Sequence, residues 1–445
     1  MSIDLLIKNG IVITMDGEDR RFKRGAVAVS GNAIVAVGPE EDVAADGAEK
    51  VIDARIIDAG GGIIMPGLVN THTHAAMTLF RGLADDLPLM EWLQDHIFPA
   101  EARLDADKVY AGSTLACAEM ILSGTTLFCD MYLFEGAVAR AAKDAGVRAV
   151  VGEVLYDFPS PHYGSIEKGF EYTEALIEKW RGDPLVTIAV EPHSPYLCAP
   201  DLLKRAEAIS KTHDIPLVIH VAETRGEVEQ MQERYGKTPV GHLADLGLLS
   251  PRLLACHCVA LTTDDIALLR DHGVTVAHNP ESNMKLASGI APIPRLLDAG
   301  VRVALGTDGC SSNNNLDMFG EMDTAAKLHK VHTLDPTVLD ADTVLRMATI
   351  DGARALGLGD ITGSLEPGKR ADLIVIDTDK PHLTPMYHPE SHLVYAVRGS
   401  DVAHTVIDGR VVMTDRRLTT IDRAALYAQI ADIGREIRAI NGKRN

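Results

Sequence analysis

Two histidines separated by one residue end the apolar stretch PGLVNTHTH. Because alternate side chains of an extended strand leave on the same face, His72 and His74 can point together at one ion. Three further metal-binding residue types each end an apolar run of their own: His220 ends VIH, His257 ends LLACH and Asp308 ends VALGTD. Together they predict one metal site. Imidazoles with one carboxylate suit a borderline divalent ion such as Zn²⁺ or Fe²⁺ that keeps an open position for water.

In the middle of the chain, predicted strands alternate with predicted helices as they do in a β/α barrel. Short apolar strands recur, mostly with helical patterns between them, at residues 68–72, 125–130, 148–154, 185–191, 216–220, 252–257, 274–278 and 301–307. Eight strands alternating with helices are what a closed (β/α)8 TIM-like barrel requires. An open doubly wound sheet is the alternative, but no G-x-G-x-x-G follows the first strand.

The carboxyl ends of barrel strands surround an active site. Residues of metal-binding or acid–base type lie at or just past the ends of strands one, four, five, six and eight. They are His72, His193, His220, His257 and Asp308. We therefore expect residues that are far apart in the sequence to lie close together at the carboxyl-terminal end of the barrel.

Both ends of the chain differ from the middle in their pattern of β-branched residues and glycines. Residues 1–65 and 363–420 alternate β-branched runs with glycine turns, as in LLIKNGIVITM and HTVIDGRVVMT. We predict that they form one small β-sandwich beside a barrel domain of residues 66–362. Residues 421–445 follow a threonine that can cap a helix, and apolar residues recur three and four apart, so we predict a C-terminal helix.

The overall charge and composition exclude some classes of partner. The net charge of −20 favours a small neutral or cationic ligand over nucleic acid or an anionic membrane, because both of these need a basic patch. The N-terminus has no basic region before an apolar core, and no stretch approaches the about 18 uninterrupted apolar residues of a membrane span. Six cysteines without a C-x-x-C pair indicate buried, reduced thiols. These features predict a cytoplasmic protein.

Several longer motifs resemble those of the amidohydrolase superfamily. They are PGLVNTHTH, HVAET, HNPESNMKLASG (278–289) and LGTDGCSSNNNLDM (305–318). Within the superfamily, FRGLADDLPLMEWLQDHIFPAE (80–101) and EPHSPYLC (191–198) resemble the 5-methylthioadenosine/S-adenosylhomocysteine deaminases and related 5'-deoxyadenosine deaminases. The resemblance implies a metal-dependent hydrolytic deaminase that converts the 6-amino group of adenosine-type nucleosides to the inosine analogue and ammonia. Residues 278–289 are expected to form a loop after strand seven.

The resemblance assigns the metal ligands among the converging residues. The implied ligands of one divalent ion per chain are His72, His74, His220 and Asp308. Zn²⁺ is the first choice of ion, with Fe²⁺ or Mn²⁺ as alternatives. Binuclear relatives hold a second ion through a lysine at the end of a middle strand, but Lys168 and Lys179 fall in a helical region here. A single ion is therefore expected.

The resemblance also implies catalytic roles. Glu223 lies three residues after His220, where its carboxyl group can reach a bound ring, and it is expected to transfer a proton to the purine. His257 and Asp308 are expected to orient the attacking water and take its proton, which Asp308 passes to the leaving amine. Taken alone, Glu223 would be interpreted as a helix-start carboxylate and His257 as a core histidine.

Substrate contacts are expected from these acids and from further positions. Glu101 matches the family position that hydrogen-bonds the ribose hydroxyls, since a carboxylate can accept from two vicinal hydroxyls. His193 matches a substrate-contacting histidine, and Glu223 and Asp308 face the reacting ring. Trp92 is expected to form the base of a pocket for the 5' substituent. An aromatic residue on a helix is, however, more often part of the hydrophobic core.

One position departs from the family. Homologues that accept S-adenosylhomocysteine carry arginines that can pair with its carboxylate. The first such position is Glu153 in this chain, and the loop 157–168 contains no arginine. Because two carboxylates repel each other, we expect 5'-methylthioadenosine, 5'-deoxyadenosine or adenosine to be preferred over S-adenosylhomocysteine.

Two alternatives keep the same fold. Another amidohydrolase, such as a guanine or cytosine deaminase or a triazine hydrolase, would share the metal site, but EPHSPYLC and FPAE argue against it. A non-enzymatic relative would be expected to have lost ligands, and none is missing here. The expected partner is a small-molecule nucleoside, with no nucleic acid and no membrane. Because family members commonly self-associate, a homo-oligomer is compatible with the sequence.

Overall fold

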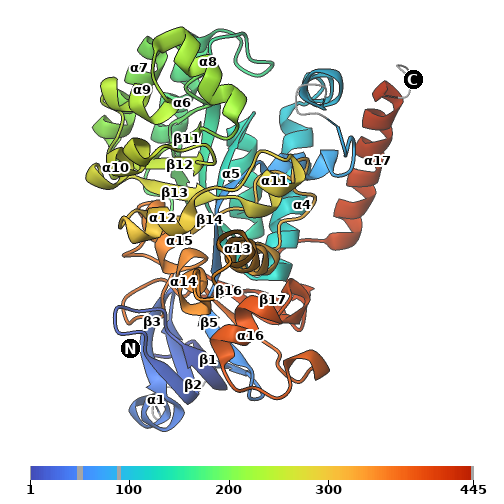
Figure 1. Ribbon diagram of the computed structural model, residues 1–445. Coiled ribbons are helices and arrows are strands. Elements are labelled where there is room, and N and C mark those ends of the chain that lie inside the picture. Colours follow the sequence, from blue (N-terminus) through green and yellow to red (C-terminus); the bar gives the residue numbers. More distant parts are fainter. Residues whose placement is uncertain (1, 48–53, 88–91, 442–445) are drawn as a thin grey trace.

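The protein has two parts, which lie one above the other in Figure 1. The upper part contains strands and helices from the middle of the chain, and the lower part contains a sheet with strands from both ends. The computed structural model describes residues 2–47, 54–87 and 92–441, without the side chains of residues 44–47, 92–94 and 439–441.

Parallel strands form a barrel in the upper part. They are β6 (Leu68–Thr73), β7 (Thr125–Tyr132), β8 (Arg148–Leu155), β9 (Val186–Ile188), β10 (Glu191–Pro192), β11 (Leu217–Val221), β12 (Leu253–His257), β13 (Thr275–His278) and β14 (Arg302–Leu305). A five-stranded sheet holds β6 to β10, and a four-stranded sheet holds β11 to β14. A parallel bridge from Val190 to Leu217 joins the sheets on one side, and the Thr71 hydroxyl donates to the Leu305 carbonyl (2.8 Å) on the other. The expected barrel is confirmed, with its fourth strand divided into β9 and β10.

The barrel strands read as near-continuous apolar runs because neither of their faces meets solvent. Every residue of β7, β8 and β12 is buried. Helices follow the strands and lie on the outside of the barrel (Figure 1). They include α4 (Ala106–Ser123), α5 (Glu135–Ala145), α6 (Ile166–Trp180), α7 (Pro200–His213), α8 (Arg225–Tyr235), α9 (Pro239–Asp245), α10 (Thr263–Asp271), α12 (Ile293–Asp298), α13 (Met318–Thr333), α14 (Ala341–Met347) and α15 (Ile350–Ala355).

In the described part of the chain between β6 and α4 lie the short helices η1 (Ala75–Phe80), η2 (Trp92–Ile97) and α3 (Phe98–Glu101). Helical segments in other connections are α1 (Glu40–Gly47), α11 (Pro280–Lys285), η3 (Pro381–Leu383), α16 (Pro389–Tyr395) and η4 (Gly399–Asp401). The prediction of a loop over residues 278–289 is therefore wrong at its centre, where Pro280 provides the fixed φ that suits the first turn of α11.

Strands from both ends of the chain pair in one nine-stranded sheet. They are β1 (Leu5–Ile13), β2 (Arg21–Ser30), β3 (Ala33–Pro39), β4 (Arg55–Asp58), β5 (Ile63–Pro66), β15 (Leu373–Ile376), β16 (Val402–Ile407), β17 (Arg410–Thr414) and β18 (Arg417–Leu418). The two ends meet where β5 pairs antiparallel with β15, with Ile64 opposite Val375. These two residues belong to one buried apolar cluster together with Ile7, Val27 and Val406. The β-rich unit of both termini is confirmed, whereas its limits at residues 65 and 363 stay a prediction.

The chain ends in helix α17 (Arg423–Asn441), which packs against α4 along the side of the barrel (Figure 1). Its first turn is capped by Asp422, whose carboxylate accepts from the backbone N–H groups of Ala424 (3.0 Å) and Ala425 (3.1 Å). The predicted helix is present, but its cap is Asp422 and not a threonine. Among the described residues, no helix has the length and apolar character needed to cross a membrane.

A buried ion pair joins the barrel to the terminal sheet. Arg148 at the start of β8 donates from Nε to Asp372 Oδ2 (2.7 Å) and from Nη2 to Asp372 Oδ1 (3.2 Å), while Nη1 donates to the Pro184 carbonyl (2.6 Å). Both partners are almost completely buried. Removing one partner from such a pair leaves the other charge without compensation in the interior.

We expect the substitution Arg148→Leu to destabilise the protein by about 3–5 kcal/mol, because Asp372 keeps its charge and loses its cation. Chemical denaturation followed by circular dichroism measures this change. The matched control is Arg24→Leu, which removes the exposed ion pair with Glu40 and should leave stability close to the wild-type value. A loss for Arg148→Leu no larger than that of the control would contradict the prediction.

Candidate metal centre and active site

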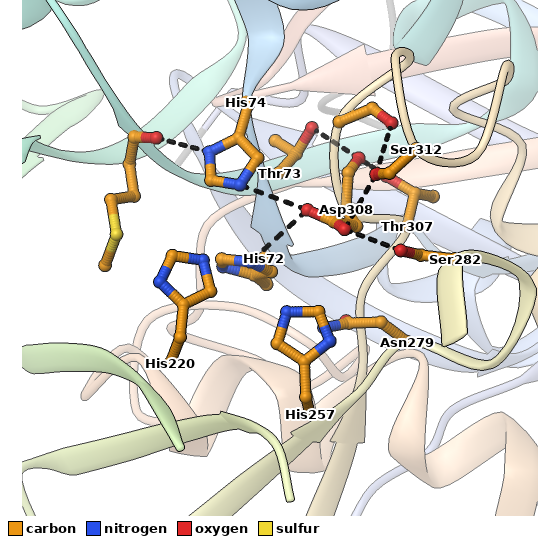
Figure 2. A network of polar contacts seen from close by, with 12 residues as sticks. His72, Thr73, His74, His220, His257, Asn279, Ser282, Thr307, Asp308 and Ser312 are labelled. Atoms are coloured by element: carbon orange, nitrogen blue, oxygen red, sulfur yellow. Dashed lines mark hydrogen bonds and ion pairs between the residues drawn. The ribbon is translucent and has the colours of Figure 1, made fainter. Parts of the chain in front are cut away.

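The ends of the barrel strands bring together the five residues singled out in the sequence (Figure 2). His72 and His74 come from the end of β6, His220 from β11 and His257 from the last position of β12. Asp308 follows three residues after the end of β14 and adopts a left-handed backbone conformation (φ 61°). Figure 2 shows all five side chains pointing toward one centre.

The distances within this cluster are those of a metal-binding group. The ligand atoms of His72, His220 and His257 all lie within 4.8 Å of one another, and so do those of His72, His74 and Asp308. His72 belongs to both groups and therefore lies at the middle of the cluster. Both ring nitrogens of His72 are buried without a hydrogen-bond partner. A buried, unpaired imidazole nitrogen fits a metal ligand, because a bound ion would supply the missing partner.

Hydrogen bonds on the far side of the rings fix which nitrogen faces the centre. His74 Nδ1 bonds to the Met131 carbonyl, and His220 Nδ1 bonds to the His193 carbonyl (2.7 Å). Because a carbonyl can only accept, each Nδ1 carries a proton, and each Nε2 is the nitrogen that faces the centre. His257 Nδ1 lies 2.9 Å from Asn283 Oδ1 and is held in the same way. Such outer partners are the usual means of orienting metal-binding histidines.

Two serines fix the Asp308 carboxylate. Ser282 Oγ (2.6 Å) and Ser312 Oγ (2.7 Å) both donate to its Oδ2 atom. The other oxygen, Oδ1, lies 3.1 Å from His74 Nε2 and 3.5 Å from His72 Nε2. One carboxylate oxygen is therefore occupied by protein donors, and the second faces the imidazoles.

The protonation states follow from burial and from this carboxylate. Burial lowers the pKa of His72 to about 4 and keeps the pKa of His220 well below its usual value, so both rings are neutral and able to bind a metal ion. Burial also acts to lower the pKa of His74, but the hydrogen bond and charge of Asp308, the bond to the Met131 carbonyl and the charge of Asp130 together outweigh it and raise this pKa to about 9. Burial would raise the pKa of Asp308, yet the imidazoles hold it well below its usual value. A divalent cation would compete with the proton shared by His74 and Asp308.

A cavity of about 510 Å³ opens in front of the cluster and is lined by most of the predicted site residues. Glu101 at the end of α3 accepts a hydrogen bond from the Tyr132 hydroxyl (2.8 Å), and its removal from bulk water raises its pKa to about 7. The ring of His193 lies 4.7 Å from the ring of His220, and burial lowers the pKa of His193 to about 3. The cavity therefore combines the metal-binding cluster with further acceptor groups at its wall.

Glu223 also lines this cavity, just after β11. Its Oε1 accepts from Ser288 Oγ (3.4 Å), and its Oε2 lies 3.9 Å from His257 Nε2. Its backbone is held by Glu227, whose buried carboxylate accepts from the N–H groups of Ala222 (3.1 Å) and Glu223 (2.8 Å). The Glu223 side chain therefore faces the cavity from a fixed backbone position.

Sequence reasoning missed two residues that support the site. Glu227 lies in the first turn of α8, three residues after the capping residue Thr224, and this T-x-x-E spacing is the signal that would have found it. Asn283 lies in the segment that was expected to form a loop, and its bond to His257 comes from its place on α11. No spacing rule predicts that contact.

Of two expectations about the 5' side of the pocket, the one for Glu153 is wrong and the one for Trp92 stays a prediction. Glu153 was expected to face the substrate, but it is fully buried and does not line the cavity. Its carboxylate accepts from the N–H groups of Phe134 (3.3 Å) and Glu135 (2.9 Å) and lies 2.7 Å from His162 Nδ1. That prediction is wrong because Glu153 and the cavity-lining Val154 point to opposite faces of β8. Trp92 begins η2, but its side chain lies outside the described residues.

The buried Glu227 carboxyl should make stability depend on pH. Burial raises its pKa to about 8, above the ordinary value of 4.5, so the folded state binds a proton more tightly than the unfolded state does. The stability that Glu227 contributes is present below pH 4.5 and is lost as the pH rises toward 8. Because Glu227→Gln cannot titrate, its melting temperature should rise relative to wild type across this window. A constant difference between the two proteins from pH 4.5 to 8 would contradict the assignment.

The arrangement matches known proteins along nearly the whole chain. Residues 63–412 match the amidohydrolase family. A 5-methylthioadenosine/S-adenosylhomocysteine deaminase of Syntrophobacter fumaroxidans is 63% identical over 435 residues, with 98% of each chain covered. A 5'-deoxyadenosine deaminase of Methanosarcina mazei is 47% identical over 438 residues, covering 98% of this chain and 99% of the relative.

A solved structure agrees with these sequence relatives. The crystal structure of an adenosine deaminase from Xanthomonas campestris with bound zinc has a TM-score of 0.95 to this chain at 43% identity, and the match covers 98% of this chain and 99% of that chain. Both the residue cluster and this neighbour support a divalent metal ion. The chain therefore belongs to the amidohydrolase family, in the branch of the 5-methylthioadenosine/S-adenosylhomocysteine deaminases.

Proposed function

We propose that this chain is a zinc-dependent aminohydrolase that converts the 6-amino group of adenosine-type nucleosides to a carbonyl group and releases ammonia. The observation that carries this function is one cavity in which a metal-binding cluster, Glu223 and Glu101 face the same space. Relatives named for deamination of 5-methylthioadenosine, S-adenosylhomocysteine and 5'-deoxyadenosine support the nucleoside class. The six buried free thiols support a reducing, cytoplasmic location.

The residues that would hold a single ion are His72, His74, His220 and Asp308. The three imidazoles offer Nε2 lone pairs, and Asp308 offers the oxygen that no serine occupies. When bound, a divalent ion supplies an activated water at neutral pH. His257, fixed by Asn283, would orient the attacking water.

Proton transfers by the protein complete the reaction. Asp308 takes one proton from the attacking water as its oxygen bonds to the ring carbon that carries the amine. Glu223 gives a proton to the neighbouring ring nitrogen, so that the ring does not accumulate negative charge. Asp308 then gives its proton to the amine, which leaves as ammonia, and Glu223 recovers a proton from the new hydroxyl group as the carbonyl forms. Both carboxyl groups return to their starting states.

Two residues at the cavity wall would orient the nucleoside. Glu101 accepts from the Tyr132 hydroxyl through Oε1, which leaves acceptor capacity for the vicinal ribose hydroxyls. His193 is uncharged because burial lowers its pKa to about 3, and it can donate or accept toward the purine or the ribose. The substrate would thus be held at the sugar and the base while its 6-amino group faces the metal cluster.

The substrate class is tested by ammonia release from a panel of adenosine, 5'-deoxyadenosine, 5'-methylthioadenosine, guanine and cytosine. We expect release from the three adenosine-type nucleosides and none from the free bases, because Glu101 needs ribose hydroxyls. A coupled enzymatic assay measures the release of ammonia from every compound of the panel under the same conditions. Turnover of guanine or cytosine alone would overturn the proposed nucleoside specificity.

Metal dependence is tested by the content of the purified protein. We expect about one zinc per chain in the wild type, because the proposed ligands surround one site. The substitution His74→Ala should lower both zinc content and deamination by removing one ligand. His332→Ala is the matched control, since His332 is exposed on α13 and belongs to neither group of possible metal ligands among the described residues. Equal zinc content in His74→Ala and in the control would exclude His74 as a ligand.

The role of Glu223 is tested by Glu223→Gln, which keeps the shape of the side chain and removes its proton transfer. We expect kcat to fall by roughly 10²–10⁴-fold while zinc content is unchanged. Glu229→Gln changes an exposed glutamate of α8 and should have wild-type kcat. A Glu223→Gln enzyme with more than a tenth of wild-type kcat would remove Glu223 from the mechanism.

A further inference from the structure

A pair of buried carboxyl groups lies behind the metal-binding cluster and takes no part in the proposed deamination. Asp130 lies near the end of β7, Glu135 is the first residue of α5, and neither side chain meets solvent. The two side chains lie within hydrogen-bonding reach of each other. Asp130 Oδ2 and both carboxyl oxygens of Glu135 nevertheless have no donor partner. Buried polar atoms without a partner are rare in folded proteins and require an explanation.

Asp130 supports the strand that carries the two metal-binding histidines. The pairing of β6 with β7 becomes irregular between Asn70 and Thr73 and resumes where Thr73 lies opposite Asp130. Just beyond, the Asp130 Oδ1 atom accepts from the backbone N–H of Ala75, the residue after His74. The carbonyl of the next residue of β7 accepts from His74 Nδ1. This part of β7 therefore holds both the backbone and the ring of His74.

The Glu135 carboxyl group does not cap its own helix. An acid in the first turn of a helix usually accepts from the free N–H groups there. In α5, however, the N–H groups of Phe134 (3.3 Å) and Glu135 (2.9 Å) donate to the carboxylate of Glu153 on β8. Because another acid occupies these donors, the Glu135 side chain is free to reach Asp130.

One proton resolves the conflict between the two carboxyl groups. Two adjacent carboxylates in a protein interior repel each other, so one of them takes a proton and becomes a hydrogen-bond donor. Burial and the charge of Asp130 raise the pKa of Glu135 well above its usual value. Burial also raises the pKa of Asp130, but hydrogen bonds from Glu135 and from the Ala75 N–H limit the rise to about 6. At neutral pH the proton therefore belongs on Glu135, and Asp130 accepts.

A proton fits this place better than a metal ion does. The groups of possible metal ligands among the described residues contain neither Asp130 nor Glu135. Two further acids approach Glu135, namely Glu153 from β8 and Glu191 from β10. Their charges act to raise the pKa of Glu135, which further favours its un-ionised form.

We propose that Glu135 is a positioning residue of the metal centre, whose un-ionised carboxyl group donates to Asp130 and thereby fixes the backbone next to His74. Outer partners of this kind orient metal ligands, and their loss commonly weakens metal binding. The inference rests on the metal site of the proposed function and does not depend on the nucleoside. Zinc affinity, measured without any substrate, therefore tests it separately from deamination.

Two substitutions at Glu135 distinguish a hydrogen-bond donor from a side chain that only fills space. Glu135→Gln keeps an N–H donor for Asp130 in nearly the same volume, whereas Glu135→Leu fills the space and donates nothing. We expect Glu135→Leu to bind zinc roughly tenfold or more weakly than Glu135→Gln, as measured by competition with a chelator. Equal zinc affinities of the two variants would overturn the proposal, whether or not the wild type deaminates nucleosides.

A second background shows whether Glu135 acts through Asp130. In Asp130→Asn the side chain can still accept from the Ala75 N–H but carries no charge. The difference in zinc affinity between Glu135→Gln and Glu135→Leu should then shrink to about threefold or less, because the carboxylate that needs the donor is gone. A difference as large as in the original background would mean that Glu135 acts by another route, and the proposal would fail.

Infrared spectroscopy tests the proton itself and needs no destabilising variant. An un-ionised carboxylic acid has a C=O stretching band that is separate from the bands of carboxylates and amides. At neutral pH, zinc-loaded Glu135→Gln should lose one such band relative to the zinc-loaded wild type. Glu229→Gln, which changes an exposed glutamate of α8, is the matched control and should lose none. An unchanged band in Glu135→Gln would show that Glu135 is not the donor and would overturn the proposal.

Discussion

The carboxylate of Asp308 is buried among histidines, and this arrangement needs a positive charge. Its Oδ2 atom already accepts from Ser282 and Ser312, so only Oδ1 is left to receive a cation or a proton. Without a metal ion, protonated His74 provides this positive charge, because its pKa is raised to about 9. A divalent ion would satisfy Asp308 and, at the same time, the unpaired Nε2 of His72. The rest of the site is arranged around this one electrostatic requirement.

The parallel barrel explains how residues more than 200 positions apart meet this requirement. All barrel strands run in one direction, so their carboxyl ends lie on one side and the residues there converge. The convergence is fixed by backbone contacts: Asp308 N–H donates to the His72 carbonyl (2.9 Å), and His220 N–H donates to the His193 carbonyl (3.0 Å). Among the residues that the structure describes, the terminal sheet contributes none to the cavity wall, and it is tied to the barrel through the buried pair of Arg148 and Asp372.

The sequence was sufficient for the barrel and for the converging residues because both follow from local pattern. An apolar run predicts a buried strand, and a polar residue at its end predicts a place at the mouth. Contacts that depend on three-dimensional packing were not predictable in this way. Glu153 was assigned to the pocket by its position in the sequence, but the side of β8 on which it lies directs it to Phe134 and Glu135. The bond from His257 to Asn283 required the fold of α11, which the sequence suggested only as a loop.

The central claim is that one metal ion lies between His72, His74, His220 and Asp308 and serves the deamination. An anomalous difference map at the zinc edge, from crystals of the zinc-loaded protein, tests it most directly. The account predicts a single peak per chain, bounded by the Nε2 atoms of the three histidines and by Asp308 Oδ1. A peak at the buried cysteines, a second peak in the barrel mouth, or a peak without Asp308 among its neighbours would contradict it.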